Sequence, residues 1–438
     1  MVRFCDLKED TLFNRVSRAV IWPVLGTGTA QGLLLLASIL TARWLGTNDF
    51  GRLGLIQVTL NTVIAFITPT FGWPLMYTGA TSRNIHQLRE MAGPILKAGT
   101  LGGVMLSVGL LILTPWIGEH WFKDVGLQKA FQISMLSIFP YSIFVLQVSL
   151  LAGLEKFREV AMLNALRGML MMLCMAIGSF RWGLNGAAWG ITLSTYLVGL
   201  VGGVSLLRLS KEGGCFLYNT NLAWRGFYVL RDTSLPSFLS TALVSLAIWL
   251  GNVLLMRTPN GLAEVALFNA TNHWRTLLLF LPTQISQSNI PILANLWNIS
   301  QIKRFRLLMI TSLMLSFITA VIPSLIVIVA AEPILYLYRL YSLDGIPAFR
   351  LLIFSGVMGA LCSMLGTAII AMGRFWQGLF MNFVWTLLLI GTAFALRERG
   401  AVGLAIAYTV AYAVLFIISF AYVVLAVEKA AHFHGGNR

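Results

Sequence analysis

Runs of 18 or more apolar residues recur along almost the whole 438-residue chain, and each is long enough to cross a bilayer as a helix. Hydrophobic residues make up 58% of the sequence and charged residues only 11%, whereas soluble domains carry about 25% charged residues. We therefore expect an all-α polytopic membrane protein with twelve transmembrane helices. The expected spans are 19–42, 53–79, 93–118, 129–154, 160–180, 186–208, 233–256, 265–292, 307–331, 348–372, 377–396 and 401–427.

The net charge of +15 comes from basic residues scattered among short loops. They form no dense arm and no patch interleaved with aromatic residues, which argues against nucleic-acid binding. With the N-terminus inside, the predicted inner segments hold 19 Lys and Arg residues and the outer segments hold 10. The positive-inside rule then predicts that the N- and C-termini are both cytoplasmic. No cleavage site follows the first apolar run, which is expected to remain as the first span.

Short matching segments indicate that the chain is an internal duplication. Thr41–Gly54 (TARWLGTNDFGRLG) forms a predicted polar loop between the first two runs, and Met256–Asn269 (MRTPNGLAEVALFN) is a looser copy 215 residues later. The segment 151–168 matches 369–386, and GLNGAA (183–188) matches GAVGLA (400–405), at offsets of 218 and 217. Asp49 and Glu264 occupy matching positions in the two loops, where a turn-forming or helix-capping role is expected.

Six spans in each copy return the chain to the same side of the membrane, so the copies are expected to be parallel repeats. The predicted units are six-helix bundles at 1–208 and 233–438, joined by a cytoplasmic linker at 209–232. Two such bundles would enclose a cleft, and rocking of one against the other would open it to alternate sides.

RWLGTNDFG after the first span, GLEKF before the fifth and GLNGAA entering the sixth, with GRF and GAVG in the second half, resemble the polysaccharide transporter family. This family comprises the flippases for lipid-linked oligosaccharides in the multidrug/oligosaccharidyl-lipid/polysaccharide exporter superfamily. The resemblance implies a V-shaped helical bundle in the bacterial inner (cytoplasmic) membrane. It also implies transfer of undecaprenyl-diphosphate-linked oligosaccharides to the outer leaflet for O-antigen, capsule or exopolysaccharide synthesis, through a cavity that contains basic residues.

Arg275 is the principal candidate for contact with an anionic substrate. It lies about 15 Å from the outer end of the eighth predicted span, at 1.5 Å per residue. A charge at this depth is expected to face the bundle interior or water, and a guanidinium can bind phosphate through two hydrogen bonds. A structural ion pair, or snorkelling from a shallower depth, would explain it equally well.

Further candidates lie in or near other spans. Arg167 is about 10 Å deep in the fifth span, and either cavity contact or snorkelling accounts for it. Asn269, Asn272 and His273 form a polar stripe at helical spacing, which faces either a cavity or a neighbouring helix; His273 could also respond to pH. The remaining candidates, each with helix packing or interfacial placement as the alternative, are Asn61, Asn252 and Lys97.

No Walker loop, HExxH motif or GxSxG motif with partners occurs, so we expect neither an enzyme nor a bound cofactor or metal. A cation-coupled drug antiporter is the main alternative, but it would need carboxylates within the spans, which contain almost none. A polytopic glycosyltransferase would need a large outer loop, and the longest outer segment, Glu332–Pro347, is short. The expected partners are a polyprenyl-diphosphate-linked glycan, membrane lipid, H⁺ or Na⁺ as a coupling ion, and the polysaccharide polymerase and chain-length machinery.

Overall fold

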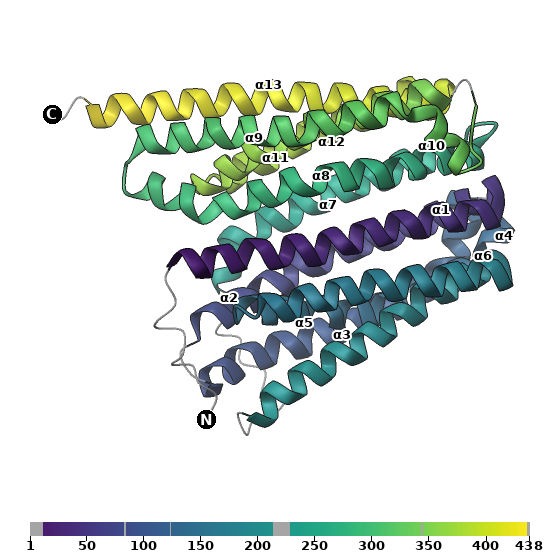
Figure 1. The fold of residues 1–438 in the computed structure, drawn as a ribbon, viewed down its shortest axis with the longest axis horizontal. Coiled ribbons are helices and arrows are strands. Elements are labelled where there is room, and N and C mark those ends of the chain that lie inside the picture. Colours follow the sequence, from purple (N-terminus) through teal and green to yellow (C-terminus); the bar gives the residue numbers. More distant parts are fainter. Residues whose placement is uncertain (1–11, 83–84, 123, 213–227, 343–344, 436–438) are drawn as a thin grey trace. The chain divides into compact units, whose positions relative to one another are not determined.

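The structure, a computed structural model, describes residues 12–82, 85–122, 124–212, 228–342 and 345–435, which form helices joined by short turns without any strand (Figure 1). Contacts divide the chain into two compact units, Met1–Ala242 (unit 1) and Leu243–Arg438 (unit 2). The division falls inside α7 (Tyr228–Met256). Most of the linker predicted at 209–232 lies outside the described residues, because 213–227 are not among them.

Unit 1 contains α1 to α6 and the first part of α7. The helices are α1 (Leu12–Ile67), α2 (Trp73–Thr81), α3 (Ile85–Ile117), α4 (Val125–Met135), α5 (Ile138–Gly153) and α6 (Phe157–Glu212), with π-helical turns at Thr68–Gly72 and Gly118–Phe122. The sequence predicted one continuous span at 129–154, but the chain breaks at Leu136 and Ser137 between α4 and α5. Pro140 explains the break, because it has no N–H to donate to the carbonyl of Leu136.

Unit 2 is organised around α11 (Gly345–Ala371), which packs against α8 (Gly261–Asn298), α9 (Ile302–Val329) and α13 (Gly400–Gly435). The other elements are α10 (Ala331–Leu337), α12 (Phe375–Ala395) and a 3-10 turn at Arg397–Arg399. Phe349, Ile353 and Met364 of α11 are fully buried. By contrast, α9 exposes large apolar side chains such as Ile326 and Val329, as a lipid-facing helix does.

Nine segments among the described residues are long and apolar enough to cross a membrane. Two of them, Ile21–Ala80 and Phe157–Ser205, have 60 and 49 residues, whereas about 20 residues suffice for one crossing. Each is interrupted by one non-helical glycine, Gly46 in α1 and Gly183 in α6. Counting these two segments as two passes each gives eleven passes among the described residues. The 38-residue α8 is not one of the nine segments, and the count of twelve stays a prediction.

The polar segment around Gly46 was predicted to be a loop, and this is wrong. Only Gly46 departs from helical geometry (φ 75°, ψ 175°), and helix continues from Thr47 through Gly54. A glycine tolerates this conformation without the steric cost that a Cβ would impose. The connection is therefore a single-residue reversal, and Asp49 lies in the first turn of the second helical arm.

The two units share backbone turns at the offsets predicted from the sequence. Gly183 and Gly400, 217 residues apart, have nearly the same conformation, with φ 60° and ψ −142° at Gly183 and φ 54° and ψ −134° at Gly400. Glu155 and Gly373, 218 residues apart, both have positive φ, 58° and 73°. Two of the three matched segments therefore carry the same local break in both units, whereas at the offset of 215 Gly46 has positive φ and Gly261 does not.

Replacement of Gly183 by Ala is expected to destabilise the protein by about 1–2 kcal/mol, because this φ/ψ combination is nearly confined to glycine. Open space surrounds the position, so the cost comes from the backbone alone. Gly109→Ala in α3 is the matched control, since it also has open space and a helical backbone; its melting temperature should stay the same or rise. Thermal unfolding in detergent measures both, and equal loss in the two variants would contradict the assignment.

Candidate functional site

Arg275 projects from α8 into the interior of unit 2, where only 7% of it is exposed. Its guanidinium carbon lies 5.3 Å from the ring centroid of Tyr408 and 5.3 Å from that of Tyr412. These tyrosines are four residues apart on α13 and therefore present their rings on one side of that helix. The cation thus rests against two aromatic faces, an arrangement worth up to about 2 kcal/mol when water is excluded.

The cluster around Arg275, which we call the arginine cage, also includes residues of α11 and α12. Trp385 of α12 is 2% exposed, and its ring lies 5.3 Å from Tyr412 and 6.1 Å from Tyr408. Gly356 of α11 provides the space for the arginine stem, because a Cβ there would lie 3.1 Å from Arg275 Cγ. Four helices therefore fix the position of one cation.

Among the described residues, the charge in the arginine cage has no anionic partner. Arg275 Nη1 donates a long hydrogen bond of 3.3 Å to Asn272 Oδ1 one turn earlier on α8. Its Nε is buried and has no hydrogen-bond partner among the described residues, and the described part of the chain offers it no salt bridge. A buried guanidinium with an unsatisfied N–H retains capacity to bind an anion.

Arg167 occupies a smaller cluster in unit 1. It projects from α6, is half-buried, and donates from Nη1 to the hydroxyl of Tyr141 at 3.1 Å. Its guanidinium carbon lies 5.1 Å from the Tyr141 ring centroid and 5.5 Å from that of Phe144, both on α5. Each unit therefore holds an embedded arginine against two aromatic rings. Within the described residues, Arg167 also lacks a carboxylate partner.

The other predicted residues are distributed among several surroundings. Asn272 contacts Arg275, whereas Asn269 is buried and donates to the carbonyl of Val265 on its own helix at 3.0 Å. His273 is half-buried on α8. Asn252 is 1% exposed and donates to the Ile248 carbonyl at 2.9 Å, while its Oδ1 is buried without a partner among the described residues.

Asn61 and Lys97 belong to unit 1. Asn61 is exposed on α1, and Lys97 is half-buried on α3. Among the contacts described here, the hydrogen bond between Arg275 and Asn272 is the one that joins two of the predicted residues.

The aromatic residues of the cage were not predicted from the sequence. Tyr408 and Tyr412 lie in an otherwise apolar stretch, AYTVAYAV, and their spacing of four is a detectable signal for one helix face. Trp385 gives no such signal, since a tryptophan in a span fits lipid contact or core packing equally well. Its role depends on the packing of α12 against α13.

The acids in the matching segments after the first and seventh spans have structural roles. Asp49 accepts from Arg52 Nη1 at 2.7 Å, and Arg52 also binds both carboxylate oxygens of Asp124, at 2.7 and 3.1 Å. Asp124 in turn caps the N-terminus of α4 through the Gly126 N–H. In unit 2, Glu264 Oε2 accepts the Ala401 N–H at 2.7 Å, at the start of α13. These contacts tie helix ends together.

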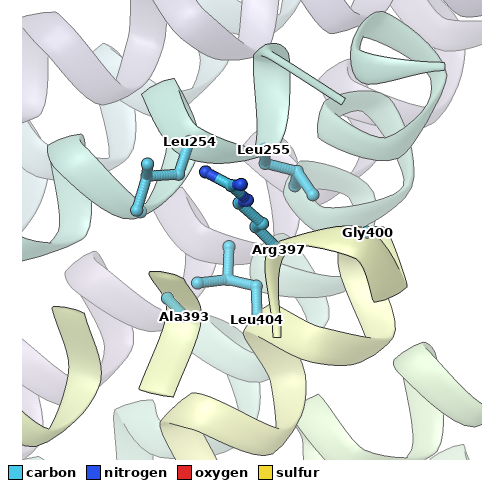
Figure 2. A pocket seen from close by; sticks show the side chains of 7 residues that line it. Leu254, Leu255, Ala393, Arg397, Gly400 and Leu404 are labelled. Atoms are coloured by element: carbon cyan, nitrogen blue, oxygen red, sulfur yellow. The ribbon is translucent and has the colours of Figure 1, made fainter. Parts of the chain in front are cut away.

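A small recess in unit 2 surrounds Arg397, beside the ends of α7, α12 and α13. Figure 2 shows the guanidinium of Arg397 extending between Leu254, Leu255 and Leu404. The recess has a volume of about 10 Å³, which accommodates one water molecule at most. It is therefore too small to hold a substrate.

Two cysteines lie among the described residues, and both are free thiols. Cys174 is half-buried and Cys362 is buried. Cys5 and Cys215 lie outside the described residues.

Three of the solved structures similar to this chain are described as transporters of the MOP superfamily. An inward-facing multidrug resistance MATE family transporter of the MOP superfamily aligns with a TM-score of 0.74 at 18% identity, covering 91% of this chain and 96% of its own. An outward-facing multidrug resistance MATE family transporter aligns with a TM-score of 0.70 at 17% identity, covering 97% of this chain and 98% of its own. A MOP superfamily transporter from Pyrococcus furiosus aligns with a TM-score of 0.73 at 17% identity, covering 96% of this chain and 99% of its own. The chain therefore has the MOP transporter fold and is a multi-pass membrane protein.

The family assignment narrows the class of protein further than the fold does. A family model described as "Polysaccharide biosynthesis protein" matches residues 16–297, well over half of the chain. The chain belongs to this polysaccharide biosynthesis family, as the motif resemblance indicated. No curated protein sequence matches the chain significantly.

Replacement of Arg275 by Met is expected to leave the melting temperature unchanged or raise it. Met fills an aromatic pocket well and removes a buried charge whose Nε is unsatisfied. Arg52→Met is the contrasting control, because it breaks contacts with two carboxylates and should cost about 1–3 kcal/mol. Thermal unfolding in one detergent compares them, and a loss of stability in Arg275→Met as large as that in Arg52→Met would show that Arg275 is a structural residue.

Proposed function

We propose that this protein is a flippase that moves polyprenyl-diphosphate-linked oligosaccharides across the bacterial inner membrane for surface polysaccharide synthesis. Membership of the polysaccharide biosynthesis family and the MOP transporter fold support a role in transport. The observation that carries the proposal is the charge of Arg275, which lies in the bundle interior without a carboxylate partner among the described residues.

The chemistry of a diphosphate-linked lipid matches this charge. A diphosphate carries negative charge through the membrane interior, where an anion needs a fixed cation because water does not solvate it. A guanidinium presents several N–H donors in one plane and binds phosphate oxygens in pairs. Arg275 and Arg167 would supply these donors, and Asn272 would orient Arg275. The glycan would follow the diphosphate while the polyprenyl tail remained in lipid.

The two predicted bundles, 1–208 and 233–438, would alternate between inward-open and outward-open arrangements. The exposure of Arg275 would then increase at the stage that accepts the diphosphate. The contacts with Tyr408 and Tyr412 are weak enough to exchange for phosphate oxygens, since a cation–π contact is worth less than a charge-assisted hydrogen-bond pair. The cage would hold the cation in place until the substrate arrives.

A cation-coupled antiporter is the second candidate, because multidrug MATE transporters share the fold. Cationic substrates and coupling ions need carboxylates within the spans. In the described part of the chain, the acids lie at or near helix ends, as Asp49, Asp124 and Glu264 do. The sign of the embedded charge therefore favours an anionic substrate.

The test uses vesicles that contain only this protein and a lipid-linked oligosaccharide in the inner leaflet. The arrival of glycan in the outer leaflet is followed with an external lectin. Arg275→Ala combined with Arg167→Ala should lower the initial rate about tenfold or more, since two charge-assisted contacts are lost. Lys at both positions should restore part of the rate, because the charge returns without the bidentate geometry.

Lys303→Ala combined with Arg306→Ala is the matched control. It also removes two positive charges, but from exposed positions on α9, and its rate should equal that of the unmodified protein. A wild-type rate in the Arg275 and Arg167 double variant, at equal protein per vesicle, would refute the site. The absence of transfer by the unmodified protein with and without a proton or sodium gradient would refute the function.

A further inference from the structure

A groove with a volume of about 970 Å³ lies between α4 and α6, and all its lining residues belong to unit 1. Its walls are largely apolar and aromatic. Trp182 and Trp189 of α6 line it and are 68% and 53% exposed. Neither the cluster around Arg167 nor the arginine cage contributes to this groove.

The groove exists because the two arms of α6 approach each other backbone to backbone. Gly178 meets Gly186, and Gly190 meets the carbonyl of Cys174, so any Cβ at these glycines would overlap the opposite arm. One partner of each pair precedes Gly183 and the other follows it, and the second pair is farther from Gly183 on both sides than the first. The two arms of α6 therefore run antiparallel from the reversal at Gly183. Side chains therefore do not fill this seam, and α4, which packs against α6, contributes the other lining residues.

The groove has the length of one membrane leaflet. Its lining on the second arm of α6 runs from Asn185 to Tyr196, about 16 Å at 1.5 Å per residue. Half of the hydrocarbon core of a bilayer is about 15 Å thick. The groove therefore runs from the end of the bundle near Gly183 to about the middle of the membrane.

Among the described residues that line the groove, Lys129 of α4 is the one cation. It is exposed, and Ile133 of α4 and Leu136, which caps that helix, follow it on the same side. Thr192 Oγ1 donates to the Ile133 carbonyl at 2.9 Å. Farther along the chain, Pro140 lies beside Gly199, where a Cβ would be 3.5 Å from the Pro140 carbonyl oxygen. The chain from α4 into α5 therefore runs parallel to the second arm of α6, and Lys129, one turn before Ile133, lies toward the Gly183 end. No acidic residue is among the described residues that line the groove.

We propose that this groove binds one anionic phospholipid of the surrounding membrane, with an acyl chain along the groove and its phosphate on Lys129. A cation at the membrane surface and an apolar trough one leaflet deep match the two parts of such a lipid. Trp182 lies at the same end, where tryptophan side chains commonly contact headgroups. With cytoplasmic termini, as predicted, the lipid belongs to the outer leaflet.

The first test measures lipid retention by native mass spectrometry of the full-length protein, using phosphatidylglycerol, phosphatidylcholine and inorganic phosphate as separate probes. One phosphatidylglycerol should remain bound more strongly than phosphatidylcholine, and inorganic phosphate should not be retained. Lys129→Ala should weaken phosphatidylglycerol binding about fivefold, the effect of one lysine near an anionic headgroup. Lys303→Ala removes an exposed charge outside the groove and should leave binding unchanged.

The second test locates the acyl chain with a phosphatidylglycerol that carries a photoreactive group on that chain. Labelling should fall on the peptides covering 129–136 and 174–196. Leu193→Trp fills the groove and should abolish this labelling, whereas Leu200→Trp, at an exposed α6 position outside the groove, should not. Equal binding of both lipids, or labelling that Leu193→Trp leaves unchanged, would overturn the proposal. So would labelling that a polyprenyl phosphate displaces and unlabelled phosphatidylglycerol does not, because that result assigns the groove to the carrier lipid.

Discussion

The contact of the Arg275 guanidinium with the faces of Tyr408 and Tyr412 determines the electrostatics of unit 2. An arginine at the centre of a membrane-spanning helix costs about 2.5–3.5 kcal/mol on insertion scales. The two aromatic faces together offset part of that cost, about 2 kcal/mol. They do not neutralise the charge, as a carboxylate would. The interior of the bundle therefore keeps a positive charge in a region of low dielectric.

Acidic groups have a different place in the molecule. Asp124 and Glu264 bind helix N-termini, and Asp49 and Asp124 share Arg52. At these ends the acids satisfy backbone N–H groups that a helix leaves unpaired. Arg275 and Arg167 lie within their units, with aromatic partners, whereas these carboxylates lie at helix ends, with backbone and arginine partners. This separation of charge is the basis on which we propose an anionic cargo.

The sequence predicted that Arg275 and Arg167 lie within long apolar helices, and they lie in α8 and α6. It also predicted the pairing of Gly183 with Gly400, which have matching backbone angles. The loop at Gly46 was wrong, since polar residues there continue a helix whose only irregular residue is one glycine. The arginine cage could not be predicted, because Tyr408, Tyr412 and Trp385 converge on Arg275 only through the packing of α8, α11, α12 and α13.

A structure of the protein in a lipid nanodisc with a polyprenyl diphosphate tests the central claim most directly. We predict that a phosphate group lies within hydrogen-bond distance of the Arg275 guanidinium, at about 3 Å. The guanidinium should then have exchanged at least one of the Tyr408 and Tyr412 contacts for phosphate oxygens. A bound diphosphate in a structure that keeps Arg275 against both rings, with no phosphate contact, would contradict the account.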